Sequence, residues 1–169
     1  MKSQSKIIAE IVVAVALAYA LNLIAILRLP QGGSVTAASM VPILWLALRR
    51  GPKIGVFGGV IFSLVDLFPQ PFIVHPVQFL LDYPLAFGAL GLAGLLRGHP
   101  ITGVAAGIFG RFICHFISGL VFFATYAPTG MNPAVYSAVY NGSYLVLELI
   151  FSTVVVYMLI KRGIITMNL

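Results

Sequence analysis

The chain is poor in charge: of its 169 residues only 8% are Asp, Glu, Lys or Arg, whereas 60% are hydrophobic. A soluble domain typically has about 25% charged residues, so this chain has too little polar surface to cover a water-soluble globule. Lipid is the solvent that suits such a surface. The length allows about six short or tilted spans and leaves no room for a domain outside the membrane.

Motifs for hydrolysis and redox chemistry are also missing. The sequence has no phosphate-binding glycine loop ending in Lys-Ser or Lys-Thr, no His-Glu-x-x-His, no Cys-x-x-Cys and no Gly-x-Ser-x-Gly. Cys114 is the only cysteine, so the chain cannot form an internal disulfide. We therefore expect no cofactor, no metal and no ATP hydrolysis in this chain. If it transports a solute, the energy must come from elsewhere.

Apolar runs separated by Pro, Gly and basic residues predict an all-α fold, a six-helix transmembrane bundle that forms one membrane domain over residues 1–169. The expected helices span approximately residues 7–27, 34–48, 54–68, 76–96, 101–123 and 133–160. The first apolar run continues to Leu27, which is too long for the core of a signal peptide, so we interpret it as the first span.

The basic residues favour one side of this arrangement. If six helices alternate, eight basic residues fall on one side and Arg28 alone on the other, with Arg111 inside a helix. The eight are Lys2, Lys6, Arg49, Arg50, Lys53, Arg97, Lys161 and Arg162. The positive-inside rule then predicts that both termini are cytoplasmic. This rule explains the net charge of +6 better than nucleic-acid binding does, so the lipid bilayer is the expected partner of the surface.

Polar groups from three different spans fall at one depth. At a rise of about 1.5 Å per residue, Asp82 lies roughly 9 Å below the outer end of its helix, and His115 and Asn141 lie roughly 12 Å below theirs. Tyr136 lies above them, with Phe72 and Phe123 near the mouth. This pattern predicts an outward-facing pocket for a small, flat, cationic heterocycle: the carboxylate balances charge, the amide and imidazole fix orientation, and rings stack.

Two alternatives remain open from these residues. A single Asn or His in a span often only bonds a neighbouring helix, in which case the chain is a structural or assembly subunit. Asp82 and His115 could instead be the acid and base of an intramembrane enzyme. Deeper in the membrane, Arg111 and Glu148 are interpreted as a buried ion pair that bridges the last two helices. Asp66 and Glu10 lie near helix ends and are expected to be solvated.

Small residues repeat at four-residue spacing in the first helix. Ala14 with Ala18, and Ala16 with Ala20, predict a broad flat face that allows close approach of another helix. From the sequence, docking to a partner and packing inside the chain are equally favoured as roles of this face.

Several segments resemble the thiamine-specific substrate-binding subunits of energy-coupling factor (ECF) transporters. The similarity covers nearly the whole chain and is most specific between the fifth and sixth helices. It is carried by residues 111–119 (RFICHFISG), 126–128 (YAP), 130–133 (GMNP), 136–137 (YS), 140–143 (YNGS), 46–51 (LALRRG) and 82–87 (DYPLAF).

The resemblance implies a six-helix vitamin-capture subunit in the plasma membrane of a prokaryote. It would dock, partly through the small residues of the first helix, onto a membrane coupling subunit that carries two ATPase subunits. By position, His115, Tyr136 and Asn141 match pocket residues of the family, Gly119 lines the pocket, and Tyr83 follows the acidic position.

Some positions depart from the family pattern. Asp82 stands where the family has glutamate, and Phe123 stands where tryptophan is usual. Phe62 lies near another expected tryptophan, and Phe72 replaces a tyrosine. The polar residues of the family's pocket are thus kept, whereas the aromatic residues that would stack on the ligand are changed. Thiamine is the ligand that the resemblance implies, with a related pyrimidine or thiazole compound as the alternative.

Overall fold

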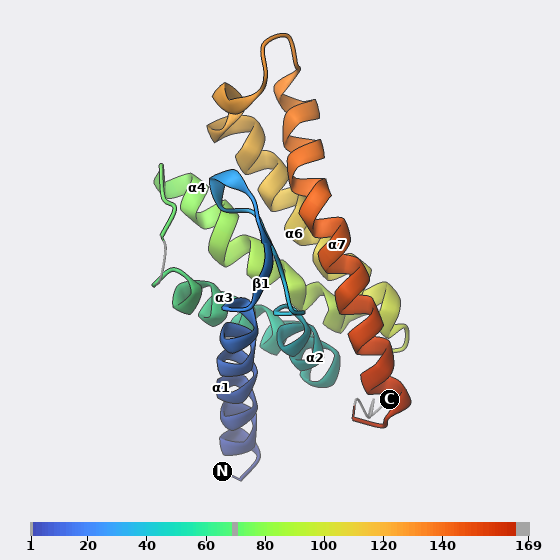
Figure 1. Ribbon diagram of the computed structural model, residues 1–169. Coiled ribbons are helices and arrows are strands. Elements are labelled where there is room, and N and C mark those ends of the chain that lie inside the picture. Colours follow the sequence, from blue (N-terminus) through green and yellow to red (C-terminus); the bar gives the residue numbers. More distant parts are fainter. Residues whose placement is uncertain (1, 69–70, 165–169) are drawn as a thin grey trace.

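The computed structural model describes residues 2–68 and 71–164 and shows a mostly helical molecule (Figure 1). Its helical segments are α1 (Lys2–Asn22), α2 (Val41–Arg50), α3 (Pro52–Asp66), a composite fourth helix, α6 (Pro100–Phe122) and α7 (Pro133–Lys161). Within these described residues, four helices are long and apolar enough to cross a membrane: Gln4–Asn22, Pro76–Leu95, Pro100–Phe122 and Pro133–Lys161. The prediction of an all-helical bundle is therefore confirmed in its main lines, and α2 and α3 are short helices between long ones.

The composite fourth helix changes its winding along its length. It runs as α4 (Pro76–Leu80), a π-helical turn η2 (Leu81–Leu85), α5 (Ala86–Ala89) and a 3-10 segment η3 (Leu90–Leu95). Pro84 lies inside the π turn, and a proline lacks the N–H that an α-helical ladder requires. Such widened turns often occur at functional sites, and this one carries Asp82 and Tyr83.

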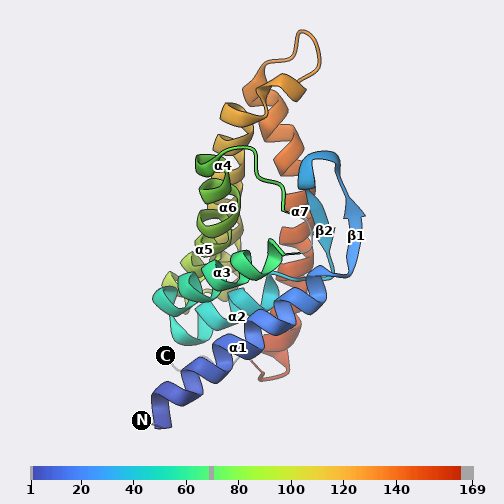
Figure 2. The ribbon, with the colours of Figure 1, turned by 90° about the vertical axis from the view of Figure 1, so that its left-hand side faces the viewer.

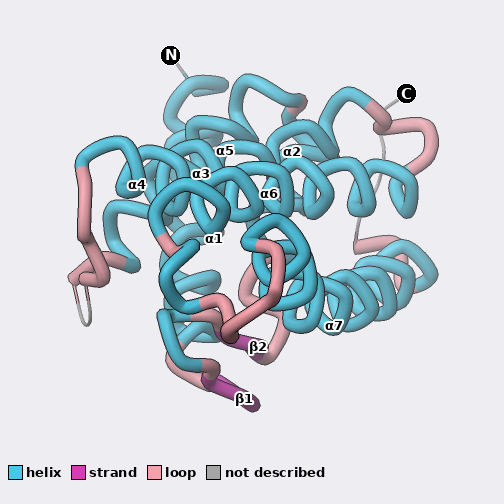
Figure 3. The backbone as a smooth tube through the Cα atoms, turned by 90° about the horizontal axis from the view of Figure 1, so that it is seen from above, coloured by secondary structure: helices cyan, strands magenta, loops and turns pink. Residues whose placement is uncertain are grey.

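A β-hairpin replaces the predicted end of the first helix and start of the second. Strand β1 (Ala25–Arg28) pairs antiparallel with β2 (Ser34–Thr36), around a turn containing the short 3-10 segment η1 (Pro30–Gly32). The predicted helices 7–27 and 34–48 were wrong in these parts. Figures 2 and 3 show the hairpin at one edge of the helical assembly, beside α7.

The hairpin is bonded to α7 at both of its ends. At the turn, the Tyr140 hydroxyl accepts a hydrogen bond from the N–H of Gly33 at 3.1 Å and donates one to the carbonyl of Pro30. At the base, the Glu148 carboxyl accepts from the N–H and the hydroxyl of Thr36. These bonds hold the hairpin against α7.

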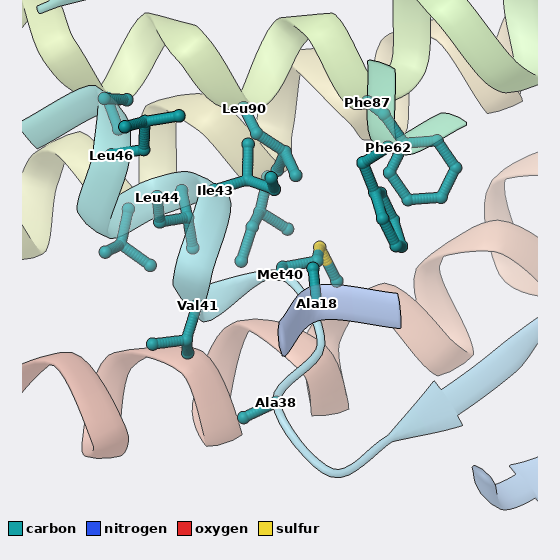
Figure 4. Close-up of a cluster of buried hydrophobic side chains, with 14 of the residues drawn as sticks. Ala18, Ala38, Met40, Val41, Ile43, Leu44, Leu46, Phe62, Phe87 and Leu90 are labelled. Atoms are coloured by element: carbon teal, nitrogen blue, oxygen red, sulfur yellow. The ribbon is translucent and has the colours of Figure 1, made fainter. Parts of the chain in front are cut away.

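The hydrophobic core is centred on α2, whose Ile43, Leu44 and Leu46 are fully buried (Figure 4). The composite helix packs closely on α3, because Gly59 has no side chain: a Cβ there would lie 2.2 Å from the carbonyl oxygen of Phe87. This close packing fixes the fourth helix, and with it the π turn, against the rest of the molecule.

The alanines of α1 divide between two faces rather than forming one. Ala14 and Ala18 are buried inside the chain, with exposed fractions of 3% and 0%, whereas Ala16 and Ala20 are exposed. The predicted single flat face was therefore wrong, because positions two residues apart on a helix point about 200° apart. Glu10 on the same helix is paired with Arg50 at 2.5 Å and with Arg49 at 3.4 Å, so its predicted solvation was also wrong.

Candidate functional site

A cavity of about 450 Å³ lies between the hairpin, the end of α3, the fourth helix and the facing halves of α6 and α7. Pockets for small ligands usually measure about 300–1,000 Å³. Eight of the residues predicted from the sequence line this cavity: Phe72, Asp82, Tyr83, His115, Gly119, Phe123, Tyr136 and Asn141. The predicted common level of three polar groups from three helices thus corresponds to one shared space.

Asp82, His115 and Arg111 form a hydrogen-bonded relay. The Arg111 Nε donates to His115 Nε2 at 3.1 Å, and His115 Nδ1 lies 3.0 Å from Asp82 Oδ1. Because Nε2 accepts a bond, the proton of a neutral imidazole must be on Nδ1, which then donates to Asp82. The relay therefore fixes both the tautomer and the ring orientation of His115.

Neighbouring residues satisfy the second oxygen of Asp82. Its Oδ2 accepts bonds from Gln78 Nε2 at 2.7 Å and from the Ser118 hydroxyl at 2.8 Å. Gln78 precedes Asp82 by one helical turn and Ser118 follows His115 by nearly one turn, so each lies on the same helix face as its neighbour. Both carboxylate oxygens of Asp82 are thus engaged by the protein itself.

Asn141 fixes the contact between α6 and α7 at the cavity wall. Its Nδ2 donates to the carbonyl of His115 at 3.2 Å and to that of Ser137 at 3.0 Å, and its Oδ1 accepts from the Tyr144 hydroxyl at 3.0 Å. Gly119 is necessary for this approach, because a Cβ there would lie 2.2 Å from the Ser137 hydroxyl oxygen.

Aromatic rings make the outer part of the wall. The rings of Phe72 and Phe123 are stacked, with centroids 5.8 Å apart at an angle of 21°, and those of Tyr136 and Tyr140 lie 6.0 Å apart. The Tyr83 hydroxyl accepts a bond from the N–H of Phe72 at 3.2 Å, which holds that loop over the cavity.

Phe62 does not line the cavity. It is fully buried and packs edge-on against Phe87, with centroids 4.9 Å apart (Figure 4). Phe87 itself lines the cavity, and the Arg111 guanidinium lies 4.1 Å from the centre of its ring. The expected wall position of Phe62 is thus corrected: this ring supports the wall from behind.

The predicted ion pair between Arg111 and Glu148 does not form. Arg111 turns toward His115 and Phe87, and Glu148 is bonded to Thr36 on the hairpin. Equal depth in the membrane was the basis of that prediction, and depth does not specify which side of a helix a residue occupies.

One acidic residue of the cavity was overlooked. Asp66, expected to be solvated, lines the cavity and accepts a hydrogen bond from Asn22 Nδ2 at 2.5 Å. The roles of Gln78 and Ser118 could have been predicted, because they lie one helical turn from Asp82 and His115. No local pattern connects Asn22 with Asp66, because these residues are 44 positions apart in the sequence. Among residues 2–68 and 71–164, no group of three or more His, Cys, Asp or Glu is placed to hold a metal ion.

The family whose model is described as "Thiamine transporter protein (Thia_YuaJ)" matches residues 8–167. The chain belongs to this family. It is therefore a member of a family of transporters and not of enzymes, and it is a multi-pass membrane protein.

Relatives and a solved structure agree with this assignment. The thiamine transporter ThiT of Bacillus subtilis (strain 168) is 36% identical over 89% of this chain and 88% of its own length. The thiamine transporter ThiT of Lacticaseibacillus paracasei is 32% identical over 72% of this chain and 70% of its own length. A structure of ThiT from Listeria monocytogenes, at 22% identity, superposes with a TM-score of 0.86 over 95% of this chain and 96% of its own, which shows the fold of the thiamine transporter family.

Proposed function

We propose that this chain captures thiamine in the cavity, as the substrate-specific component of an ECF transporter. The observation that carries the proposal is the meeting of Asp82, His115 and Asn141 in one cavity with stacked aromatic rings at its wall. Thiamine consists of a flat aminopyrimidine and a cationic thiazolium ring, and both can stack on aromatic side chains. Membership in the thiamine transporter family supports this ligand class.

The polar groups orient the ligand in this proposal. Asp82 and the Asn141 amide oxygen have further lone pairs that can accept hydrogen bonds from the ligand. Their positions are fixed because His115, Gln78 and Tyr144 bond to them. Tyr83, Tyr136 and the Phe72–Phe123 stack surround the rings. Gly119 leaves room beside Asn141. No bond of the ligand needs to be broken, so the chain binds and releases thiamine unchanged.

The partners in this proposal are a membrane coupling subunit and two ATPase subunits. Ala16 and Ala20 of α1 are exposed beside the larger apolar residues Val12, Val13 and Leu17. Small residues at four-residue spacing allow the backbone of a partner helix to approach closely. Ala14 and Ala18 pack inside this chain, so they support α1 rather than contact the partner.

The orientation in the membrane follows from charge. The start of α1 and the end of α7 lie at the same end of the molecule (Figure 1), and the basic residues Arg50 and Lys161 end α2 and α7. The cavity is lined by the opposite part of the molecule, near the hairpin. With the basic end in the cytoplasm, the cavity opens toward the outside, where a nutrient is captured.

The ligand can be identified by calorimetric titration of the purified chain in detergent with thiamine, its isolated pyrimidine half, its isolated thiazole half and riboflavin. We expect saturable binding of thiamine, weaker binding of each half and none of riboflavin. Tighter binding of either half than of intact thiamine would assign the chain to a vitamin precursor instead.

A further inference from the structure

A buried acid outside the cavity has hydrogen bonds to only one of its two oxygens. Glu148 lies in the middle of α7, is 2% exposed and is not among the residues that line the cavity. Its Oε1 accepts two hydrogen bonds from Thr36, whereas its buried Oε2 has no hydrogen-bond partner among residues 2–68 and 71–164. The buried hydroxyl of Ser152 lacks a partner there as well. Because they are four residues apart on one helix, Glu148 and Ser152 lie on the same face of α7.

Other acids of the chain have surroundings that suit a negative charge. Asp82 accepts hydrogen bonds on both of its oxygens, and Glu10 is paired with two arginines. A buried carboxylate needs such donors or a cation in contact, because the low-dielectric interior strongly penalises an uncompensated charge. Glu148 forms no ion pair with any residue that the structure describes. Its Oε2 therefore lacks the support that a charged carboxylate requires.

Two influences oppose this conclusion, and neither supplies what Oε2 lacks. The guanidinium of Arg111 on α6 attracts a carboxylate at Glu148 without contacting it, since Arg111 donates to His115 and stacks on Phe87. The carboxylate of Asp82, on the other side of His115, partly cancels that attraction. The two hydrogen bonds from Thr36 do not require a charge, because the carbonyl oxygen of a neutral carboxylic acid has two lone pairs that can accept both.

We infer that Glu148 holds a proton on Oε2 and is a neutral carboxylic acid in the folded chain. Its carbonyl oxygen, Oε1, accepts both bonds from Thr36, which explains why the donors gather on one oxygen. The Oε2–H can donate to the hydroxyl of Ser152 after a side-chain rotation, and this bond satisfies both groups. The base of the hairpin is thus held to α7 without placing a charge inside the membrane, where charges are costly.

Infrared spectroscopy of the full chain in detergent tests this assignment directly. The C=O stretch of a protonated carboxylic acid is separate from the bands of carboxylates and of peptide groups. We expect Glu148→Gln to remove a band from this region of the parent spectrum. Asp66→Asn, the control at another acid that is half-buried, should leave that band in place. Ser152→Ala should shift the band without abolishing it, because the Oε2–H loses its acceptor.

Amide hydrogen exchange gives a second readout. Glu148→Gln has the shape of the neutral acid, with an oxygen that can accept from Thr36 and an NH2 group that can donate to Ser152. We expect it to keep exchange over residues 25–36 within about threefold of the parent, whereas Glu148→Ala should make exchange about tenfold faster, because the buried donors of Thr36 lose their acceptor. Thiamine affinity should follow the same order, since Gly33 and Ser34 of the hairpin line the cavity. Only this last expectation rests on the proposed function.

The outcomes that overturn the inference are distinct. It fails if the parent has no such band, or if Glu148→Gln leaves the whole region unchanged. It also fails if exchange in the hairpin is as fast in Glu148→Gln as in Glu148→Ala, since the charge of the acceptor would then be necessary. If Glu148→Gln does not fold, a parent spectrum that Ser152→Ala leaves unshifted would overturn it. A parent that has the band but does not bind thiamine would overturn the proposed function alone.

Discussion

Glu148 on α7 holds Thr36 at the base of the hairpin by two hydrogen bonds to one oxygen. Its Oε1 accepts from the Thr36 N–H at 2.6 Å and from the Thr36 hydroxyl at 2.7 Å, and both residues are 2% exposed. The hydroxyl also lies 2.7 Å from that of Ser39, at the approach to α2. The end of strand β2 is thus bonded to the middle of α7.

Thr36→Val should loosen the hairpin. The substitution keeps the shape and the N–H but removes the hydroxyl that bonds Glu148. A buried hydrogen bond of this kind contributes about 1–2 kcal/mol, so we expect a lower thermal midpoint and faster amide hydrogen exchange over residues 25–36. Thr102→Val, at an exposed position on α6, is the matched control and should change neither. Equal exchange rates in the two variants would show that this contact does not hold the hairpin.

Asp82→Asn should weaken the binding of thiamine. The new amide keeps only one oxygen. Its NH2 must therefore face either Gln78 and Ser118, which already donate, or His115, which would then lose the acceptor that fixes its tautomer. Breaking a buried network of this kind costs about 2–5 kcal/mol. Asp82→Glu should be milder, because it retains the carboxylate. Calorimetry of both variants checks this, and parental affinity in Asp82→Asn would exclude a role for the relay in binding.

Phe123→Trp should turn the cavity into a fluorescent reporter. Trp45, the only tryptophan of the parent, is not among the cavity residues and lies 5.4 Å from the Arg49 guanidinium, so thiamine should quench parental fluorescence weakly. An indole at position 123 would lie at the wall, where a flat cation can stack on it. We expect clear, saturable quenching with affinity kept or improved. Strong quenching in the parent would contradict this placement, because it would mean that thiamine binds near Trp45 and not in the cavity.

The two faces of α1 should respond differently to added bulk. Ala16→Leu enlarges an exposed position, so it should spare stability and thiamine binding but impair uptake by cells, because it blocks close approach of a partner helix. Ala18→Leu enlarges a fully buried position and should destabilise the chain itself by about 1–3 kcal/mol. Thermal melting, calorimetry and uptake of labelled thiamine separate the two. Parental uptake with Ala16→Leu would remove this face from the docking surface.

Local signals were sufficient for the last two helices. The sequence predicted spans at 101–123 and 133–160, and the structure has Pro100–Phe122 and Pro133–Lys161. Proline at the start of each helix marks its beginning, since its missing N–H has no partner there in any case. The meeting of His115 and Asn141 followed from counting residues along these two well-bounded helices.

The hairpin and the individual contacts needed information that is not local. Residues 23–27 are a short apolar run, which is compatible with either a helix or a strand; pairing with residues 34–36 decides for the strand. The partners of Asp66, Arg111 and Glu148 depend on the rotation of each helix about its axis, which depth in the membrane does not specify. Their contacts with Asn22, His115 and Thr36 appear only when the whole chain is packed.

A structure of the chain solved with thiamine tests the central claim most directly. The account predicts one thiamine in the cavity, with its rings between the aromatic wall and the Asp82–His115 relay. Thiamine bound outside this cavity, or a cavity left empty at saturating thiamine, would contradict the account.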